Sequence, residues 1–238
     1  MRRGLAGMTV LIVICITTAA LILGALWGAY VALGRRTEGF VVALAGGALI
    51  VSVMDELIRP SVEPLTLWGA IAAILAGAAL FSAGDYWVND RLRSSGGAGF
   101  LLAVTLDGVP ENLALGSALI GADALAVAAL AGSIFLSNLP EAAGGARQMI
   151  SDGRSRWQIL ALWSAVAALL AAAAYGGYAG LSNAPKPLLA TINCFAAGAV
   201  LASLATEVFP KAFREDSEWT GIAVAIGLSL ALALSQLG

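Results

Sequence analysis

Apolar residues fill the chain in long stretches that are separated by short polar segments. Stretches of about twenty residues, the length at which an α-helix crosses the hydrocarbon core of a bilayer, lie at 8–33, 39–57, 66–84, 98–120, 123–146, 157–180, 187–209 and 219–237. Little sequence lies between them, so the connections hold no separate soluble domain. The pattern predicts an all-α, polytopic membrane protein with eight transmembrane helices in a single domain, residues 1–238.

The composition points the same way and narrows the class of partner. Hydrophobic residues make up 60% of the chain and charged residues only 12%, against roughly a quarter charged in soluble domains. The mean hydropathy is +0.89. We therefore expect the lipid bilayer as the surrounding partner. The net charge of −2 argues neither for nor against an anionic partner, but with almost no sequence outside the apolar stretches nucleic acid is not a plausible ligand.

The distribution of basic residues predicts which way round the protein sits. Eight spans put both termini on one side, so the 13 Lys and Arg residues can be assigned to two faces. One face carries Arg2, Arg3, Arg59 and Lys186, and the other carries Arg35, Arg36, Arg91, Arg93, Arg147, Arg154, Arg156, Lys211 and Arg214. Because basic residues accumulate on the cytoplasmic side, we expect the second face to be cytoplasmic. This places the chain in a plasma (inner) membrane with both termini on the extracytoplasmic side.

Two neighbouring spans carry carboxylates in the middle of apolar sequence. The first reads LDGVPENLALG at 106–116 and contains Asp107 and Glu111, and the second reads LSNLPEAAGGA at 136–146 and contains Asn138 and Glu141. Residues three or four apart share one face of a helix. A charge at bilayer depth costs about 2.5–3.5 kcal/mol on insertion scales, so such residues normally face the bundle interior and have a function.

A proline precedes the glutamate in both segments and adds further oxygen ligands. Pro110 and Pro140 free the backbone carbonyls four residues earlier, on Leu106 and Leu136. Freed carbonyls are tolerated in a membrane where they line a cavity or coordinate an ion. Carboxylate, amide and carbonyl oxygens together suit a divalent cation. The alternative is that the polar residues only hold neighbouring helices together.

Two further segments are similar to each other. FVVALAGGALIVSVMDELIRP at 40–60 and CFAAGAVLASLATEVFPKA at 194–212 both run from small residues to an acidic residue and then a proline. This similarity suggests the internal pseudo-symmetry common in transporters. Asp55 and Glu56 would then flank an entrance and Glu207 an exit. Equally, these three would be carboxylates that reach water at the membrane surface.

With these motifs the sequence resembles the ZIP (Zrt-, Irt-like) family of divalent-metal transporters. The family's span 4 pattern, like H-N-x-P-E-G, falls on residues 107–112, its span 5 pattern, like H/Q-D/E-x-P-E-G, on 137–142, and its span 7 ending, similar to H-E-x-x-P-E-A, on 206–212. The resemblance implies a ZIP-like bundle of eight spans with pseudo-symmetric halves and both termini outside. It implies metal ligands at Asp107, Glu111, Asn138 and Glu141, with Asn112 and Ser137 also in the pathway. A homodimer is compatible with it.

The departures from the family pattern bear on the identity of the ion. The chain contains no histidine, and Asp107 stands where span 4 of the family has one. Gly108 and Asn138 replace two ligands of a second metal, so we expect one site. Zinc prefers nitrogen and sulfur ligands, whereas manganese, iron or magnesium tolerates an all-oxygen site better.

The sequence therefore predicts transport of a divalent cation of the zinc, iron or manganese class, bound at a midplane site between spans 4 and 5. The cation is the transported ligand, and no permanently bound cofactor is expected. Two alternatives remain: a ZIP-like permease for a non-metal or proton-coupled solute, and a non-transporting membrane scaffold. An enzyme is not expected, because the chain lacks histidine and contains no Gly-x-Ser-x-Gly, H-E-x-x-H or phosphate-binding motif.

Overall fold

The computed structural model of the chain describes residues 2–31, 34–92, 97–120 and 124–237, and within these ranges it contains helices and no β-strand. In chain order the helices are α1 (Arg2–Tyr30), α2 (Arg35–Ser52), the π-helix η1 (Val53–Ile58), α3 (Arg59–Leu92), α4 (Gly97–Ala118), α5 (Ala124–Ser151), α6 (Arg156–Leu181), α7 (Lys186–Ser203), the π-helix η3 (Leu204–Val208), α8 (Phe209–Glu215) and α9 (Thr220–Leu237). The predicted all-α fold class is confirmed.

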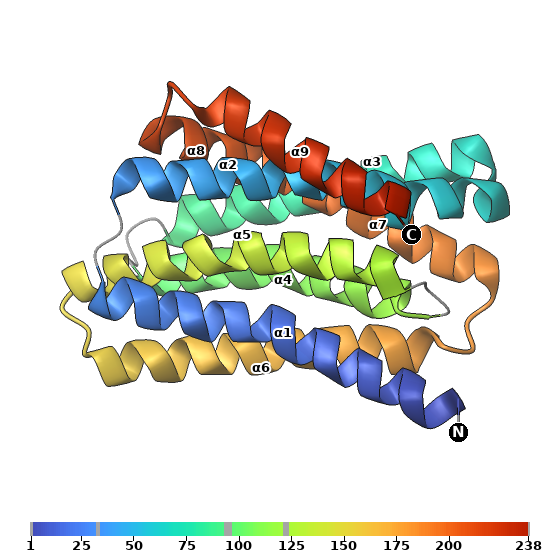
Figure 1. Cartoon of the computed structure of the whole chain (residues 1–238), viewed down its shortest axis with the longest axis horizontal. Helices are drawn as coiled ribbons and strands as arrows, with labels where there is room; N and C mark the ends of the chain where they lie inside the picture. Colours follow the sequence, from blue (N-terminus) through green and yellow to red (C-terminus); the bar gives the residue numbers. More distant parts are fainter. Residues whose placement is uncertain (1, 32–33, 93–96, 121–123, 238) are drawn as a thin grey trace.

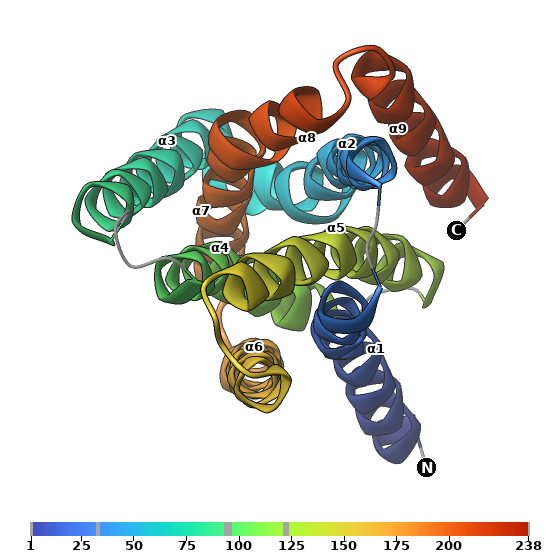
Figure 2. The same ribbon diagram turned by 90° about the vertical axis from the view of Figure 1, so that its left-hand side faces the viewer.

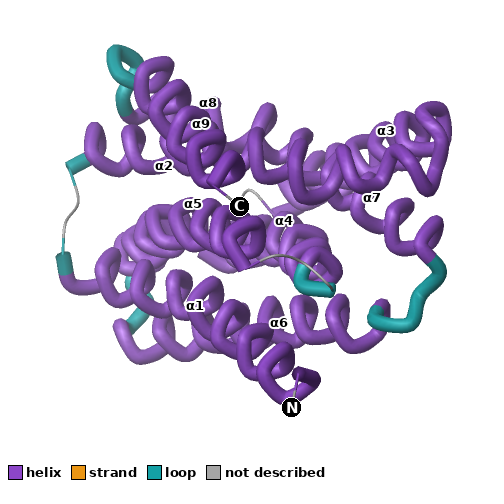
Figure 3. Tube along the Cα trace, turned by 45° about the vertical axis from the view of Figure 1, so that its right-hand side comes forward, coloured by secondary structure: helices purple, strands orange, loops and turns teal. Residues whose placement is uncertain are grey.

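The long helices lie along the longest axis of the molecule and alternate in direction, so both termini lie at the same end (Figure 1). The loops lie at the two ends of the bundle (Figure 3). Each of the predicted apolar windows falls mostly on helix. In the described part of the chain, four helical stretches are long and apolar enough to cross a membrane: Met8–Tyr30, Arg35–Trp87, Arg156–Leu181 and Lys186–Glu215.

The helices divide into two groups by their contacts. In the first group, which we call the α1/α4/α5/α6 group, α1 packs on α5 and α6, and α4 packs on α6. In the second, the α2/α3/α7–α9 group, α3 packs on α7, and α2 packs on α8 and α9. Viewed down the bundle, α4 and α5 lie in the middle, with α1 and α6 on one side and the second group on the other (Figure 2).

Glycines let the helices of the second group approach backbone to backbone. A Cβ atom on Gly47 of α2 would overlap the carbonyl oxygen of Val224 in α9, and one on Gly227 would overlap that of Leu44. The contact between α3 and α7 repeats this pattern with Gly198 against Ile74, and Gly77 against Phe195. In all four helices the glycine follows the contacted residue of its own helix by three positions, so the two helix pairs are packed in the same way.

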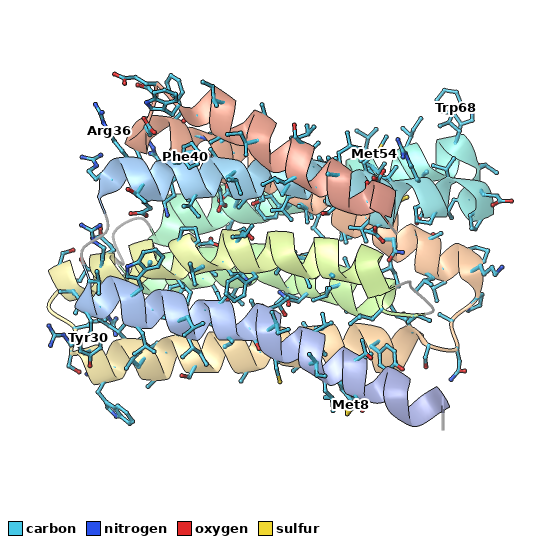
Figure 4. The ribbon with its side chains drawn as sticks, viewed as in Figure 1. Met8, Tyr30, Arg36, Phe40, Met54 and Trp68 are labelled. Carbon is cyan, nitrogen blue, oxygen red and sulfur yellow. The ribbon has the colours of Figure 1, made fainter. Side chains whose placement is uncertain are left out.

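The two ends of the bundle differ in charge. The basic end, at which α1 ends and α2 begins, carries Arg35, Arg36, Arg154, Arg156, Lys211 and Arg214. Figure 4 places Tyr30 and Arg36 at this end, and Met8 and Trp68 at the other. Tyr30, Trp157 and Trp219 are exposed at the basic end, and Trp68 is exposed at the opposite end. Exposed Trp and Tyr at both ends of apolar helices are typical of the two membrane interfaces.

The long helical segment from Arg59 to Leu92 is kinked at Thr66, where φ is 68° and ψ is 156°. Such a conformation is essentially reserved for glycine and costs a β-branched residue on the order of 1–3 kcal/mol. Replacing Thr66 with glycine should therefore stabilise the protein by about 1 kcal/mol, once the greater freedom of glycine in the unfolded chain is subtracted. The measurement is the thermal unfolding midpoint in one detergent.

Thr191 provides the matched control for this prediction, because it is also an exposed threonine but lies within α7 with its hydroxyl bonded to the Pro187 carbonyl oxygen. Thr191→Gly should lower the midpoint, since glycine disfavours a helix interior. A lower midpoint for Thr66→Gly as well would show that the backbone at residue 66 is not strained.

Candidate functional site

The candidate site lies on α4 and α5, the two helices in the middle of the bundle (Figure 2). Both helices continue through their internal prolines, Pro110 and Pro140. Each proline therefore removes one N–H donor from an otherwise continuous helix, which leaves the carbonyl of Leu106 or Leu136 without its usual α-helical partner. The interruption is local, and the polar residues on either side of each proline keep their helical spacing.

Two of the four predicted ligands are deeply buried. The Glu111 side chain is on α4 and the Asn138 side chain is on α5, and these residues are 6% and 4% exposed. Glu141 and Ser137 are partly buried one helical turn or less from Asn138. The fourth predicted ligand, Asp107, lies on the backbone of α4 one turn before Glu111, but its side chain lies outside the described residues. The helices α4 and α5 contact each other.

The described side chains alone do not form a metal cluster. Among them there is no group of three or more Asp, Glu, Cys or His side chains close enough to hold an ion. The predicted set needs Asp107 to supply its third carboxylate, so the ligand assignment stays a prediction.

Asn112, which the sequence placed in the pathway, lies on a different face of α4 from Glu111. It shares this face with Gly108 and Gly116, one turn away on either side, which pack against Leu170 and Ala174 of α6. Its amide Nδ2 donates to the Gly108 carbonyl oxygen at 2.8 Å, and its Oδ1 accepts no hydrogen bond within the described part of the chain. Asn112 is thus a polar group at the α4–α6 contact.

The acidic residues of the two similar segments lie in equivalent turns of π-helix. Asp55 and Glu56 are in η1 and Glu207 is in η3. Each π-turn is closed by an N–H that bonds the carbonyl five residues earlier, from Arg59 to Met54 and from Phe209 to Leu204. Turns of π-helix inside α-helices are often found at functional sites. The short similarity found in the sequence thus extends to a shared and uncommon backbone geometry.

The side-chain surroundings of the two π-turns also match in part. Ser52 and Ser203 precede the turns and are buried, as are the next residues, Val53 and Leu204. Of the two acids in η1, Asp55 forms an ion pair within its own helix, because its Oδ1 lies 2.8 Å from Arg59 Nη1. When Ser52 is aligned with Ser203, Glu56 falls on Glu207. Both glutamates are partly buried, one in each half of the chain.

One buried acid was not predicted from the sequence: Glu38, in the first turn of α2, is 7% exposed. Its ion pairs involve Lys211 and Arg147, which are distant in the chain. An acidic residue inside an arginine-rich junction, RRTEGF, is the only local signal that could have identified it.

No model of a known protein family matches the chain, and no curated protein matches its sequence.

Proposed function

We propose that the protein transports a divalent cation across a membrane, through a single oxygen-ligand site between α4 and α5. The observation that carries the proposal is the burial of Glu111 and Asn138 on two adjacent proline-containing helices in the middle of an apolar bundle. Carboxylates inside an apolar bundle mark ion pathways, and carboxylate and amide oxygens together are ligands that divalent cations bind. Asp107, Glu111 and Glu141 would be charged ligands and Asn138 a neutral one.

The topology in this proposal has eight spans. The stretch Arg35–Trp87 is 53 residues long and kinked at Thr66, a length that accommodates two crossings. The helices α4 and α5 and the apolar Thr220–Ala233 segment supply the rest. The proposed membrane is a plasma (inner) membrane with the basic end in the cytoplasm, which leaves both termini outside.

The internal similarity supports an alternating-access mechanism. The matching glycine contacts, the paired π-turns and the two Pro-Glu motifs are the features expected of inverted repeats, whose substrate site lies between the repeats. In this mechanism the α1/α4/α5/α6 group moves relative to the α2/α3/α7–α9 group and carries the ligands on α4 and α5 with it. The mechanism and the motifs together resemble those of the ZIP transporters.

The ligand chemistry favours a hard cation. With no histidine in the chain, the site has oxygen donors only, which suit manganese, magnesium or iron(II) better than zinc. We therefore expect the site to discriminate less in favour of zinc over manganese than a site with nitrogen and sulfur ligands does.

The test is calorimetric titration of the purified protein with manganese, zinc, iron(II) and cobalt, alongside Asp107→Ala/Glu111→Ala/Glu141→Ala. Binding should be seen in the parent and lost in the variant. The matched control removes three exposed acids instead, Glu63, Asp152 and Glu218, and should leave the affinity unchanged. Equal binding by all three proteins would show that the cation does not bind at the predicted ligands on α4 and α5.

A permease for a non-metal solute is the second candidate. It uses the same two buried polar side chains, Glu111 and Asn138, without a metal. In that case the carboxylates hold a proton or an organic cation, and vesicles containing the protein would transport solute with chelator present. If neither metal nor solute moves, the non-transporting scaffold is the remaining function.

A further inference from the structure

A buried ion-pair cluster joins three helices at the basic end of the bundle. The Glu38 carboxylate of α2 lies 3.2 Å from Nζ of Lys211 in α8, measured from Oε1, and 3.8 Å from Nη1 of Arg147 in α5, measured from Oε2. The Glu38 side chain is 8% exposed, whereas those of Lys211 and Arg147 are 24% and 37% exposed. The carboxylate is therefore the buried centre of the cluster. Lys211 lies against one of its oxygens and Arg147 against the other.

The backbone of α5 is shaped to fit this cluster. A Cβ atom on Gly144 would lie 2.6 Å from Glu38 Oε1 and 2.9 Å from Lys211 Nζ. An alanine here would force the ends of the Glu38 and Lys211 side chains to shift from their present positions. Gly144 lies one turn before Arg147, so one face of α5 provides both the space for the Glu38–Lys211 pair and the second cation.

The cluster crosses the boundary between the two helix groups. Glu38 and Lys211 both belong to the α2/α3/α7–α9 group, where α2 packs on α8, while Gly144 and Arg147 belong to α5 in the other group. At the opposite end of the molecule a neutral contact crosses the same boundary, a hydrogen bond from Ser117 Oγ of α4 to Asn193 Oδ1 of α7. These two polar contacts across the boundary thus lie at opposite ends and differ in charge.

We propose that Arg147 and Glu38 form a latch that holds the two helix groups together at the basic end, and that Ser117 and Asn193 hold them at the other end. The proposal rests on the transport function above, because a latch has a role only if the two groups move relative to each other. In the described conformation both latches are closed.

Glu38 pairs with two cations, one in each helix group, and this makes the latch reversible. A buried carboxylate left without a counter-charge is strongly unfavourable. When the groups separate at this end, Lys211 remains with Glu38, because both lie in the same group, and of the two ion pairs of Glu38 it is the one with Arg147 that is lost. Arg147 is partly exposed and gains water in exchange. Opening therefore leaves no buried charge uncompensated, and a partly exposed ion pair is weak enough to break repeatedly.

The test is a distance measurement between spin labels on the two groups, in lipid vesicles. Labels are attached at Ser151, which ends α5, and at Glu218, between α8 and α9; both are exposed at the basic end, and Cys15 and Cys194 are replaced beforehand. Arg147→Gln should increase the population at the longer distance about two- to fivefold, the range expected for loss of one partly exposed ion pair.

The matched control is Glu215→Gln, which breaks an ion pair at the same end, Arg35 Nε to Glu215 Oε2 at 2.6 Å. Because both residues of that pair lie in one group, the control should leave the distance distribution unchanged. If Arg147→Gln also leaves it unchanged, or if both variants shift it equally, the latch is overturned.

A second variant tests the latch without removing a charge. Gly144→Ala should displace the Glu38 carboxylate and increase the longer-distance population, whereas Gly132→Ala on the same helix has nothing within 4 Å of the new atom and should have no effect. Failure of the transport proposal is recognised separately, by unchanged cation binding in the carboxylate variant, and does not affect the distance result.

Discussion

Replacing Gly198 with alanine is expected to destabilise the protein by at least about 3 kcal/mol, at the upper end of the effects of overfilling a packed interior. The added Cβ atom would overlap the carbonyl oxygen of Ile74 in α3. A flexible side chain could move aside, but this oxygen belongs to the backbone of a helix. The whole of α3 must therefore shift away from α7, which loses contacts along both helices. Small residues at such crossings let membrane helices pack closely.

The size of this effect is measured from the fraction of folded protein in detergent and from the unfolding midpoint. Gly176→Ala and Gly180→Ala on α6 are the matched controls, since no atom lies within 4 Å of the Cβ position at either. Alanine should be neutral or slightly stabilising there because it favours the helix. Midpoints that agree across all three variants would contradict the close approach of α3 and α7.

Glu111→Gln should reduce cation uptake into vesicles at least about 100-fold, while the protein remains folded. Removal of a residue that only supports a metal ligand typically costs 10–100-fold in affinity or activity, and Glu111 is proposed as a ligand itself. Glutamine preserves the size of the side chain and one oxygen but removes the negative charge. A loss of uptake then shows that transport requires the negative charge at this buried position.

The comparison variant for uptake is Thr105→Val on the same helix, where the Thr105 hydroxyl donates to the Leu101 carbonyl oxygen of α4 at 2.8 Å. It should transport as the parent does. Undiminished uptake by Glu111→Gln, with manganese and with iron(II), would remove Glu111 from the cation pathway. Equal losses in Glu111→Gln and Thr105→Val would instead indicate a general disturbance of α4.

The pattern of apolar residues was sufficient to predict an all-helical fold, because long apolar runs in a short chain leave few other arrangements. It also singled out Glu111 and Asn138, which are buried in the structure, since a carboxylate or amide inside an apolar run is visible in one dimension; their role as ligands stays a prediction. The π-turns at η1 and η3 were not predicted. A π-turn differs from an α-turn by one hydrogen-bond register, and the residues of VMDELI and LATEV do not distinguish the two.

The features formed between distant segments were also beyond the sequence. Glu38, Gly144 and Lys211 come from three helices, and nothing local indicates that they meet. Likewise, the sequence does not show which residues the glycines at 47, 77, 198 and 227 contact. Their matching partners emerged from the three-dimensional contacts, because each contact joins residues from different helices.

The π-turns have a consequence for how these helices tolerate changes in length. Removing one residue from an α-helix rotates everything beyond the deletion by about 100°, a single residue's share of a 3.6-residue turn, so lipid-facing side chains would turn inward. A π-turn already contains a surplus residue relative to the α-helix on either side. Deletion within η1 or η3 can convert that turn to α-helix and leave the facing of the flanking segments intact, so these two turns are the points in the helices where a one-residue deletion is absorbed.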